Sequence, residues 1–395
     1  MSSWPVKPFG ELTENFDSVR VPVKESERKP GPYPYYGASG VVDRVDGYLF
    51  DGEYLLVAED GENLKTRQTP IAFIATGKFW VNNHAHIVRA SKNNVTRYLM
   101  YAMREADIAS FLTGSTMPKL TQGNMNRVLV VAPPRETQKA IAHILGSLDD
   151  KIELNRRMND TLEAMARALF KSWFVDFDPV RAKAEGRAPS GMHAETSKMF
   201  PSEFVESELG EIPKGWRVTK LGDVLELKRG YDLPAAQRLS GTVPIISSSG
   251  PSGLHSEAKA SAPGIVTGRY GTIGLVFYVR EDFWPLNTTL YVRDFKGTDA
   301  LYAYHLLRLV DFRKFSDKAA VPGVNRNHLH EEAVVAPPLP VQQRFTSFAS
   351  AWLDLAAQCI DQARVLTSVR DALLPRLLSG EMTVASAERA VGDVA

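Results

Sequence analysis

The chain contains one short motif twice, as VVAPPRETQ from Val130 to Gln138 and as VVAPPLPVQ from Val334 to Gln342. In each copy, apolar residues that favour a strand precede two prolines, and a long helix-like run follows. Proline lacks an N–H and is excluded from strand ladders and helix interiors, so the strand must end before the prolines and the helix must begin after them. We therefore expect each motif to join a domain to a helix.

The repeat extends well beyond this motif. The segment GKFWVNNHAHIVR (Gly77 to Arg89) aligns with EDFWPLNTTLYVR (Glu281 to Arg293) at the same offset of 204 residues, and upstream the offset grows to 210 and then 212. Small loop insertions explain this drift, so the chain is predicted to be two copies of one unit of about 170 residues. In each unit, short β-rich runs separated by glycine turns precede a modest helix, which predicts an α+β domain.

Each motif is followed by a long amphipathic pattern. Apolar residues recur at helical spacing from Gln138 to about Val175, and a second stripe follows Gln342. Thirty-eight helical residues make a rod of roughly 57 Å, too long to be buried within its own domain. If the helices pack on each other, an antiparallel pair keeps the two units equivalent, although a connector of about 35 residues leaves a parallel return open. The residues expected to pack along the helices are Ile141, Leu148, Leu162, Leu169, Phe345, Trp352, Leu366 and Leu373.

The predicted fold class is α+β, with two tandem α/β domains related by pseudo-twofold symmetry and separated by two long helices in an antiparallel coiled coil. The expected segments are a first domain at 1–133, a first long helix at 134–178, a connector at 179–212, a second domain at 213–337, a second long helix at 338–380 and a C-terminal tail at 381–395. The connector has enough glycine, proline and charge to be an exposed link or docking loop.

Composition narrows the class of protein. The chain has 395 residues, of which 44% are hydrophobic, so two or more globular domains are expected. A single cysteine, Cys359, excludes a disulfide framework and fits a reducing cytosol. Neither a signal peptide nor a membrane span is predicted, which favours a cytoplasmic protein. The formal net charge of +1 neither requires nor excludes nucleic acid, because phosphate binding needs only a local basic surface.

Basic, aromatic and amide side chains interleave at expected loop positions. Each alone is most often solvated surface, but in a two-copy protein they collectively favour a duplex DNA partner. The candidate DNA-binding residues are Lys65, Arg67, Lys78, Asn82, Asn83, His84, His86, Lys119, Arg229, Tyr231, Arg269, Tyr270, Thr272, Asn287, Thr288, Lys318 and Arg326.

Three patterns that resemble chemical sites have simpler readings. His84 and His86 share one face of a strand, but no third ligand cluster accompanies them, so no metal site is expected. The glycines of GRYGTIG lack phosphate-loop spacing and predict a β-turn. Glu226 and Lys228 form an ExK tripeptide of the kind that holds a metal in some nucleases, but the first copy reads GELTEN at that place. No catalytic residue is therefore expected.

The sequence resembles the specificity subunits of type I restriction-modification enzymes. The strongest matches are LGEIPKGWRVTKLGDV from Leu209, GSTMPKLTQGNMNRVLVVAPPRETQKAI from Gly114, and ALFKSWFVDFDPVRAKAEGR from Ala168, together with GKFWVNNHAH and the repeat itself. In that family each half contains a target recognition domain that reads one part of a bipartite DNA site. The long helices are the conserved regions, which form an antiparallel coiled coil and dock two modification subunits.

The resemblance implies a non-catalytic subunit that binds double-stranded DNA. Adenine methylation, with S-adenosylmethionine, belongs to the two modification subunits, and restriction subunits that use ATP and Mg²⁺ join through them. A rod of roughly 57 Å limits the distance between half-sites to about 17 base pairs. The two copies differ most in NNHAH against LNTTL and in AEDGENL against GRYGTIG, so two different half-sites are expected.

Two other functions compete with this hypothesis. The chain could be a tandem coiled-coil scaffold that organises proteins without recognising DNA. It could also be a self-contained nuclease that uses Glu226 and Lys228. If the assembled complex binds a bipartite duplex no more tightly than random DNA, the scaffold is favoured. DNA cleavage that is lost on Glu226→Ala would support the nuclease.

Overall fold

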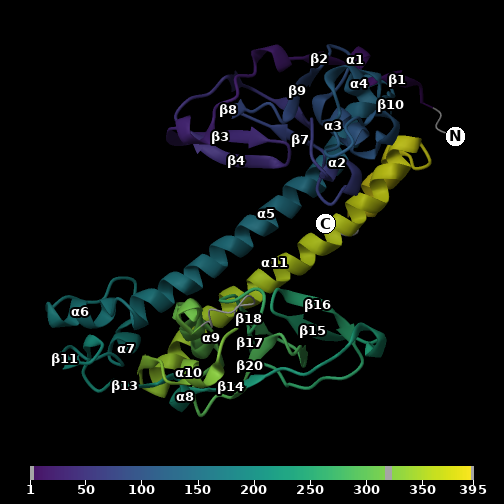
Figure 1. Ribbon diagram of the computed structural model, residues 1–395. Helices are drawn as coiled ribbons and strands as arrows, with labels where there is room; N and C mark the ends of the chain where they lie inside the picture. Colours follow the sequence, from purple (N-terminus) through teal and green to yellow (C-terminus); the bar gives the residue numbers. More distant parts are fainter. Residues whose placement is uncertain (1–3, 316–322, 393–395) are drawn as a thin grey trace. The chain divides into compact units, whose positions relative to one another are not determined.

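The computed structural model describes residues 4–315 and 323–392. The chain forms two compact units (Figure 1), each built from one α+β domain and part of both long helices. Unit 1 comprises Met1–Arg157 and Ile360–Ala395, and unit 2 comprises Met158–Cys359. The helices that connect the domains therefore contribute to the core of each unit.

The domain of unit 1 contains two four-stranded sheets and a two-stranded one. The first has the order β2-β9-β6-β7, the second has the order β4-β3-β8-β5, and β1 pairs with β10. Their bounds are β1 Val6–Pro8, β2 Thr13–Asn15, β3 Pro30–Gly37, β4 Gly40–Val45, β5 Phe50–Asp51, β6 Tyr54–Ala58, β7 Ala72–Ala75, β8 Lys78–Val81, β9 Ala85–Ala90 and β10 Leu129–Val131. The shorter helices are α1 Phe9–Leu12, α2 Asn63–Thr66, α3 Thr96–Glu105 and α4 Gln122–Arg127, with 3-10 turns η1 Asp17–Val19, η2 Glu25–Glu27 and η3 Ala109–Phe111.

The domain of unit 2 repeats most of this order of elements. One sheet has the order β14-β20-β17-β18, a second has the order β16-β15-β19, and β13 pairs with β21. The bounds are β13 Arg217–Lys220, β14 Glu226–Arg229, β15 Val243–Ser247, β16 Gly250–His255, β17 Gly264–Gly268, β18 Val276–Val279, β19 Trp284–Pro285, β20 Thr289–Asp294 and β21 Ala333–Ala336. The helices are α8 Leu221–Val224, α9 Ala300–Leu309 and α10 Arg326–His330, with η4 Ala235–Gln237 and η5 Phe312–Phe315.

The strand pairings agree in detail between the domains. In unit 1 the parallel pair β3 and β8 sets Tyr35 opposite Trp80, and in unit 2 the parallel pair β15 and β19 sets Ile245 opposite Trp284. The tryptophans are the ones that the sequence repeat aligns. The predicted α+β class and the tandem repeat are confirmed.

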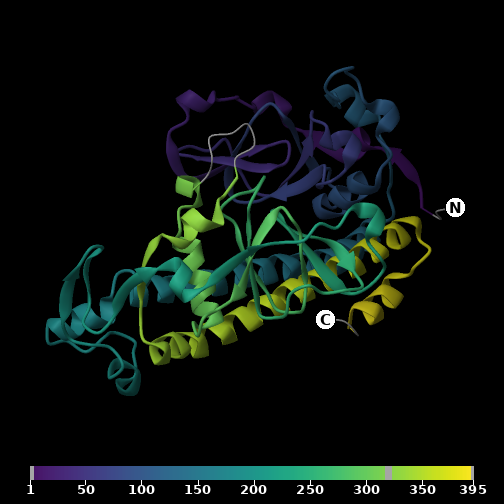
Figure 2. The ribbon, with the colours of Figure 1, turned by 60° about the horizontal axis from the view of Figure 1, so that its bottom comes forward.

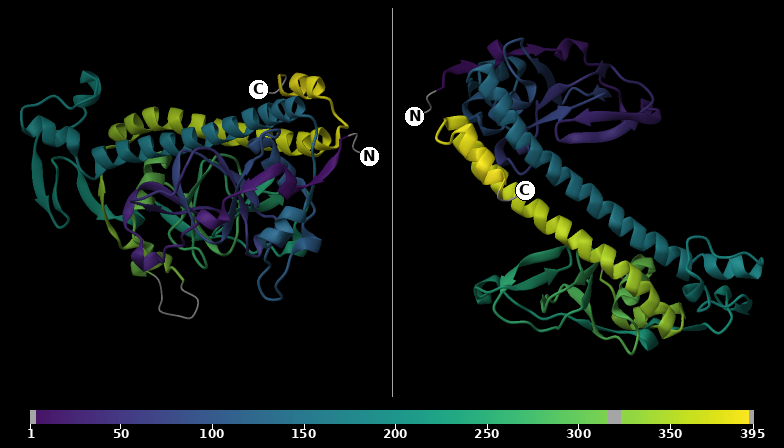
Figure 3. Two further views of the ribbon diagram at one scale, coloured as in Figure 1. Left: turned by 90° about the horizontal axis from the view of Figure 1, so that it is seen from above. Right: turned by 180° about the vertical axis from the view of Figure 1, so that it is seen from behind.

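Two long helices, α5 Arg135–Phe174 and α11 Leu339–Ser379, follow the two proline motifs. They lie side by side in both views of Figure 3. In unit 1, Arg370 of α11 donates to Asp149 of α5 at 2.7 Å. In unit 2, Trp173 of α5 meets Phe348 of α11 edge to face, with ring centroids 6.1 Å apart. A later residue of α5 thus contacts an earlier residue of α11, so the predicted antiparallel pairing is confirmed.

The expected packing residues of the long helices differ in their burial. Ile141, Leu148, Leu366 and Leu373 are buried in the core of unit 1, whereas Phe345 is fully buried in unit 2. Leu169 and Trp352 are partly buried against the core of unit 2. Leu162 is half-exposed. Seven of the eight expected positions therefore pack into the core of one unit, and Leu162 lies outside both cores.

A buried glutamine forms hydrogen bonds that attach each joint, the point where the two prolines separate the last strand of a domain from its long helix, to the domain. In unit 1, the Gln138 amide donates to Pro133 O and Asn94 Oδ1, both at 2.9 Å, and its Oε1 accepts from Val95 N at 3.0 Å. Each long helix thereby holds the residue that precedes the modest helix of its domain, α3 in this unit. Because buried polar groups must be hydrogen-bonded, the glutamine fixes where the long helix leaves the domain.

Unit 2 contains the same joint. The Gln342 amide donates to Pro337 O at 2.9 Å, and its Oε1 accepts from Asp299 N at 3.0 Å, at the N-cap of α9. Gln138 and Gln342 are only 1% and 5% exposed. The repeated motif thus has the same structural role in both units.

The segments outside the domains also contain regular structure. Residues 179–212, expected as the connector, carry most of α6 Asp178–Ala184, α7 Ala194–Ser197 and the hairpin of β11 Phe204–Ser207 with β12 Gly210–Pro213. In the segment 381–395, helix α12 Val384–Gly392 turns back beside the end of α11 (Figure 2) and buries Ala387 in the core of unit 1. Within 4–315 and 323–392, no helix combines the length and apolar character needed to cross a bilayer.

We expect Gln342→Leu to lower the free energy of unfolding by about 2 kcal/mol, because it leaves the Asp299 N–H and the Pro337 carbonyl buried without partners. Gln343→Leu, an exposed position on the same helix, is the matched control and should change it by less than about 0.5 kcal/mol. Urea unfolding followed by tryptophan fluorescence measures both. Equal effects of the two substitutions would contradict a structural role for the buried amide.

We also expect His305 of α9 to make unit 2 sensitive to acid. Burial, followed by nearby Arg308 and Arg167, lowers the pKa of His305 to about 3 from its usual 6.5, and its ring stacks on Phe170 with centroids 5.2 Å apart. The unfolded chain binds a proton that the folded one does not. The free energy of unfolding should therefore fall as the pH drops below 6.5, by about 2 kcal/mol between pH 7 and pH 5.

His305→Phe should reduce this loss, because a phenyl ring keeps the stack and cannot be protonated. His328→Phe, at an exposed position of α10, should keep the acid sensitivity of the parent chain. Urea unfolding at pH 7 and pH 5 measures the difference, and an unchanged pH dependence in His305→Phe would show that other groups cause it.

Candidate nucleic-acid interface

Three loops of unit 1 meet at one end of β6 and β9, the two central strands of its first sheet. They follow β6, precede β9 and precede α4. The Glu59 N–H donates to His84 O at 2.9 Å, the Leu120 N–H donates to Glu59 O at 2.7 Å, and Asp60 forms a β-bridge with Lys119. The segment between η3 and α4, which leads into this bridge, extends away from α5 (Figure 3, left). These hydrogen bonds bring His84 and Lys119, two predicted site residues, close together.

The same frame exists in unit 2. The Arg269 N–H donates to Thr288 O at 2.8 Å, the Val324 N–H donates to Arg269 O at 3.0 Å, and Tyr270 forms a β-bridge with Gly323. Gly323 is required here, because an added Cβ would lie 2.2 Å from the Tyr270 ring. The stretch Arg269–Tyr270 thus occupies the place that Glu59–Asp60 holds in unit 1.

Carboxylates and cations pair throughout the unit 1 loops. The Asp60 carboxylate lies 2.8 and 3.0 Å from His84 Nδ1, and Glu59 is bound by Arg20 at 2.8 Å and Lys119 at 3.1 Å. Burial raises the pKa of Glu59, but hydrogen bonds from Arg20 and Lys119 and the charge of His86 outweigh it, so the pKa lies below its usual value. Glu59 is therefore ionised at neutral pH.

His86 lies inside the domain. It is 1% exposed, its Nδ1 lies 2.6 Å from Asp17 Oδ2, and its Nε2 lies 2.7 Å from Leu120 O. Burial raises the pKa of Asp17, but the hydrogen bond and the charge of His86, with Ile87 N–H and Arg20, bring it below its usual value. In this conformation both ring nitrogens of His86 bind groups of the domain, and neither is left for a base.

Other predicted residues of unit 1 have local partners. Asn82 is 9% exposed and its Oδ1 accepts from His84 N at 2.8 Å, whereas Asn83 is exposed. The Arg67 guanidinium donates to Arg104 O at 2.7 Å and to Ala106 O at 2.8 Å, so it caps the end of α3. The Lys78 ammonium lies 4.7 Å from the centre of the Tyr48 ring, and Lys65 is exposed on α2. Asn83, His84 and Lys119 thus remain near the three loops with exposed side chains.

Cations and tyrosines gather in the unit 2 loops and in the adjoining strands β14 and β20. The Arg269 guanidinium lies 4.4 Å above the Tyr270 ring, and Lys228 Nζ donates to Tyr231 Oη at 3.2 Å. Tyr231 Oη also lies 3.1 Å from Tyr291 Oη, and hydrogen bonds from Tyr291 and then Lys228 lower the pKa of Tyr231. The phenol therefore lies in a positively charged surrounding.

The remaining predicted residues of unit 2 lie in or near these loops. Arg229 pairs with Asp232 at 3.5 Å, and Asn287 also donates to Asp232. Thr272 is exposed and Thr288 is half-buried. Arg326 is exposed at the start of α10. Lys318 lies outside the described residues.

The sequence search missed the acidic members of the unit 1 loops. Asp17, Glu59 and Asp60 were not among the predicted residues, which are cations, amides, hydroxyl and aromatic side chains. The alignment of AEDGENL with GRYGTIG contained the signal, since it sets Glu59 over Arg269 at the offset of 210. Charge reversal at aligned loop positions would have identified Glu59.

The described residues of these loops contain no cluster of metal-ligating side chains. Across residues 4–315 and 323–392, no group of three or more His, Cys, Asp or Glu side chains is placed to hold a metal ion. Glu226 is held by Arg293, and Lys228 points its ammonium at Tyr231. The ExK pair therefore serves local contacts of the sheet.

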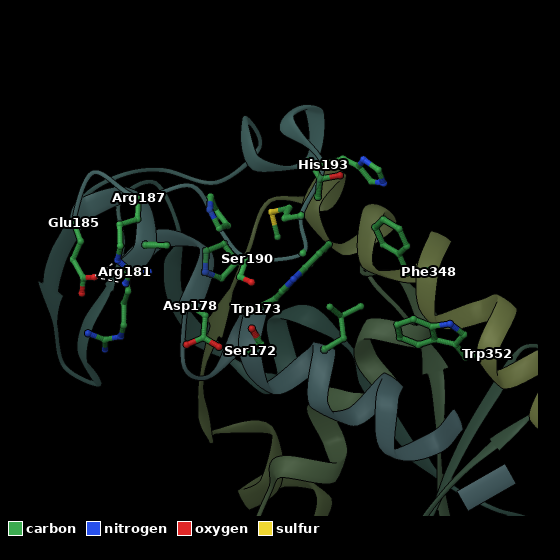
Figure 4. Close-up of a pocket in the computed structure, with 17 residues that line it drawn as sticks. Ser172, Trp173, Asp178, Arg181, Glu185, Arg187, Ser190, His193, Phe348 and Trp352 are labelled. Carbon is green, nitrogen blue, oxygen red and sulfur yellow. Dashed lines mark hydrogen bonds and ion pairs between the residues drawn. The ribbon is translucent and has the colours of Figure 1, made fainter. Parts of the chain in front are cut away.

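A second candidate site is a pocket of about 690 Å³ in unit 2, between the connector and the long helices (Figure 4). Trp173 of α5 and Phe348 and Trp352 of α11 form one apolar wall. The other side carries charged residues of α6 and the following loop, among them Arg181 and Glu185. An apolar side chain with polar neighbours, as on an amphipathic protein segment, fits such a lining.

Comparison with known proteins identifies the family. The family model "Type I restriction modification DNA specificity domain" matches residues 1–164 and 213–357. The chain is 26% identical to the MjaIX specificity subunit of Methanocaldococcus jannaschii, covering 96% of this chain and 94% of that protein. It is 28% identical to the HindI specificity subunit of Haemophilus influenzae, covering 84% of each.

A solved structure shares the fold. The crystal structure of the type I restriction-modification system S subunit from M. genitalium aligns with a TM-score of 0.66 at 15% identity, covering 95% of this chain and 96% of that one. With both family segments matched over most of the chain, this protein belongs to the family of type I restriction-modification specificity subunits.

Proposed function

We propose that this chain selects DNA for a type I restriction-modification complex by recognising a bipartite, asymmetric site. The observation that carries the proposal is the pair of matching loop frames, one per domain, whose side chains differ. The backbone hydrogen bonds of the two frames agree, but one frame carries Glu59–Asp60 and the other Arg269–Tyr270. The two domains therefore present different hydrogen-bonding groups to a DNA duplex. Because base edges are distinguished by their donors and acceptors, the two domains should prefer different sequences.

The target recognition domains are assigned to residues 1–133 and 213–337, and the long helices set the distance between their half-sites. A helix of 40 residues, such as α5, is about 60 Å long, which limits the spacing to about 18 base pairs. Bases between the half-sites face helices and make no sequence-specific contact. Such a site is read in two short parts with a fixed gap.

Chemistry on DNA is assigned to partner subunits. Two modification subunits supply adenine-N6 methylation with S-adenosylmethionine and must extrude the base from the duplex. Restriction subunits, which use ATP and Mg²⁺, join through the modification subunits. This chain supplies sequence recognition and docking surfaces, and no residue of it is assigned a catalytic role.

The pocket beside the connector is the proposed docking point for one modification subunit. Its wall of Trp173, Phe348 and Trp352 offers aromatic surface that a partner can cover, and aromatic side chains in partly buried pockets commonly dominate binding energy. The charged side formed by α6 supplies polar contacts at the rim. Docking on the helix pair leaves the loops of the domain free for DNA.

We expect sequencing of methylated adenines to give one motif with two different halves and a fixed gap of unspecified bases. The measurement uses a strain that expresses this chain with its modification partner, and a strain lacking this chain is the control. A continuous motif or a symmetric palindrome would falsify the bipartite, asymmetric assignment. Absence of any motif, with DNA binding no tighter than to random duplex, would favour a scaffold.

We expect Trp352→Ala to weaken assembly with the modification subunit by about 10-fold or more, because it removes an aromatic wall of the pocket. The matched control is Leu355→Ala, on the same helix, where the side chain is 41% exposed and lies outside the pocket lining. Titration by light scattering or calorimetry measures the affinity, and thermal unfolding checks that both variants fold. Equal affinities for Trp352→Ala and the parent chain would place docking elsewhere.

A further inference from the structure

The matching loop frames carry opposite charges within the same two-residue stretch, in which Glu59 aligns with Arg269 and Asp60 with Tyr270. In unit 1 the stretch Glu59–Asp60 is anionic, and in unit 2 the stretch Arg269–Tyr270 is cationic, although the backbone hydrogen bonds around them agree. The charged side chains of the two stretches therefore differ in whether they accept or donate hydrogen bonds. A carboxylate only accepts, and a guanidinium only donates.

Asp60 is held in a defined orientation. Both carboxylate oxygens lie within 3.0 Å of His84 Nδ1, and the Asp60 backbone is fixed by its bridge to Lys119. Its side chain is 20% exposed, compared with 13% for Glu59, which is also held by Arg20 and Lys119. Asp60 is thus the carboxylate of the pair that is better placed to meet a ligand.

A carboxylate near duplex DNA is repelled by phosphates, so it favours binding only where it meets a donor. In the major groove the cytosine N4 amino group is such a donor, with no acceptor beside it on the same base. Adenine also offers an amino group, but its N7 acceptor lies next to it and repels a carboxylate. Asp60 therefore suits cytosine best.

Arg269 is also held in a defined orientation, but its guanidinium needs hydrogen-bond acceptors on the ligand, whereas Asp60 needs a donor. Its guanidinium lies 4.4 Å over the Tyr270 ring, and that ring is packed closely against Gly323. Within the described part of the chain, Arg269 forms no ion pair with a carboxylate, whereas Arg229 pairs with Asp232. A planar, oriented guanidinium matches the O6 and N7 acceptors of guanine.

We propose that Asp60 and Arg269 are specificity-determining residues, with Asp60 accepting from cytosine N4 in one half-site and Arg269 donating to guanine O6 and N7 in the other. This inference rests on the proposed bipartite DNA recognition and adds the bases that each domain selects. His84 acts as a positioning residue, because its Nδ1 orients the Asp60 carboxylate.

The test uses the full chain in complex with its modification subunit. Duplexes carry the site found by methylation sequencing and every single-base substitution of it, and equilibrium competition at one salt concentration gives a preference at each position. We expect Asp60→Asn to lower the preference for cytosine by about 10-fold at one position of one half-site, with a gain for adenine, which asparagine prefers. Arg269→Gln should lower the preference for guanine by about 10-fold in the other half-site only.

Charge-conserving variants separate base contacts from phosphate contacts. Arg269→Lys keeps the charge but lacks the planar fork, so a base contact loses its preference and a phosphate contact does not. Asp60→Glu keeps the charge and displaces the carboxylate, so a contact to cytosine loses its preference, whereas an effect of charge alone does not. The matched controls are Glu136→Gln and Arg364→Gln, which remove the same charges from exposed positions of the long helices and should leave every preference unchanged.

Three outcomes would overturn the inference. One is uniform weakening on all duplexes with unchanged base preferences, which assigns the residues to phosphate contact or to folding. Another is a changed preference at positions where the parent complex selects neither cytosine nor guanine, and the third is an effect of both residues in the same half-site. Failure of the proposed function looks different, since the parent complex would then show no preference for the bipartite site at all.

Discussion

The hydrogen bonds of one buried glutamine in each unit fix where a long helix leaves its domain, and the core of that unit is built around this helix. Gln138 and Gln342 each bind the carbonyl of the first proline in their motif and the backbone N–H that precedes α3 or α9. The prolines cannot supply N–H groups to a ladder, so the strand must end there. The glutamine then ties the new helix back to the domain that it leaves. Without this tie, the direction of the long helix relative to its own domain would depend on apolar contacts alone, which are not directional.

Aromatic and charged contacts then distinguish the two ends of the helix pair. In unit 1, Asp149 of α5 accepts from Tyr101 at 2.5 Å and from Arg370 at 2.7 Å, so α3, α5 and α11 share one carboxylate. In unit 2, Phe170 packs against Phe345 of α11 and Tyr302 of α9. Both sets of contacts connect the two long helices with the modest helix of the domain, which is α3 in unit 1 and α9 in unit 2. The two units therefore keep one architecture although the interactions at its centre differ in kind.

Much of the fold could be predicted from sequence because its determinants are local. The proline motif and the 3.6-residue periodicity depend on residues close together in the chain, and they predicted the long helices. The aligned tryptophans predicted the repeat, and the equivalence of its two units favoured antiparallel packing. The arrangement of the candidate site could not be predicted in the same way. Asp17 meets His86 across 69 positions, and Arg20 meets Glu59 across 39, so neither pair leaves a periodic signal. His86 illustrates the consequence: it was expected on one strand face with His84, but His84 lies in the turn before β9, and two acceptors inside the domain bind the His86 ring.

Net charge gives little information about this kind of protein because its charges are balanced locally, not absent. The unit 1 loops pair Arg20 and Lys119 with Glu59, so cations lie at the surface beside carboxylates that keep them in place. The unit 2 loops orient Arg269 against an aromatic ring instead, which holds the guanidinium without neutralising it. A phosphate contact requires a free cation, whereas a base contact requires an oriented donor or acceptor. Both sets of loops meet the second requirement more fully than the first, and a chain with a formal charge of +1 can therefore be selective for DNA sequence without being strongly basic.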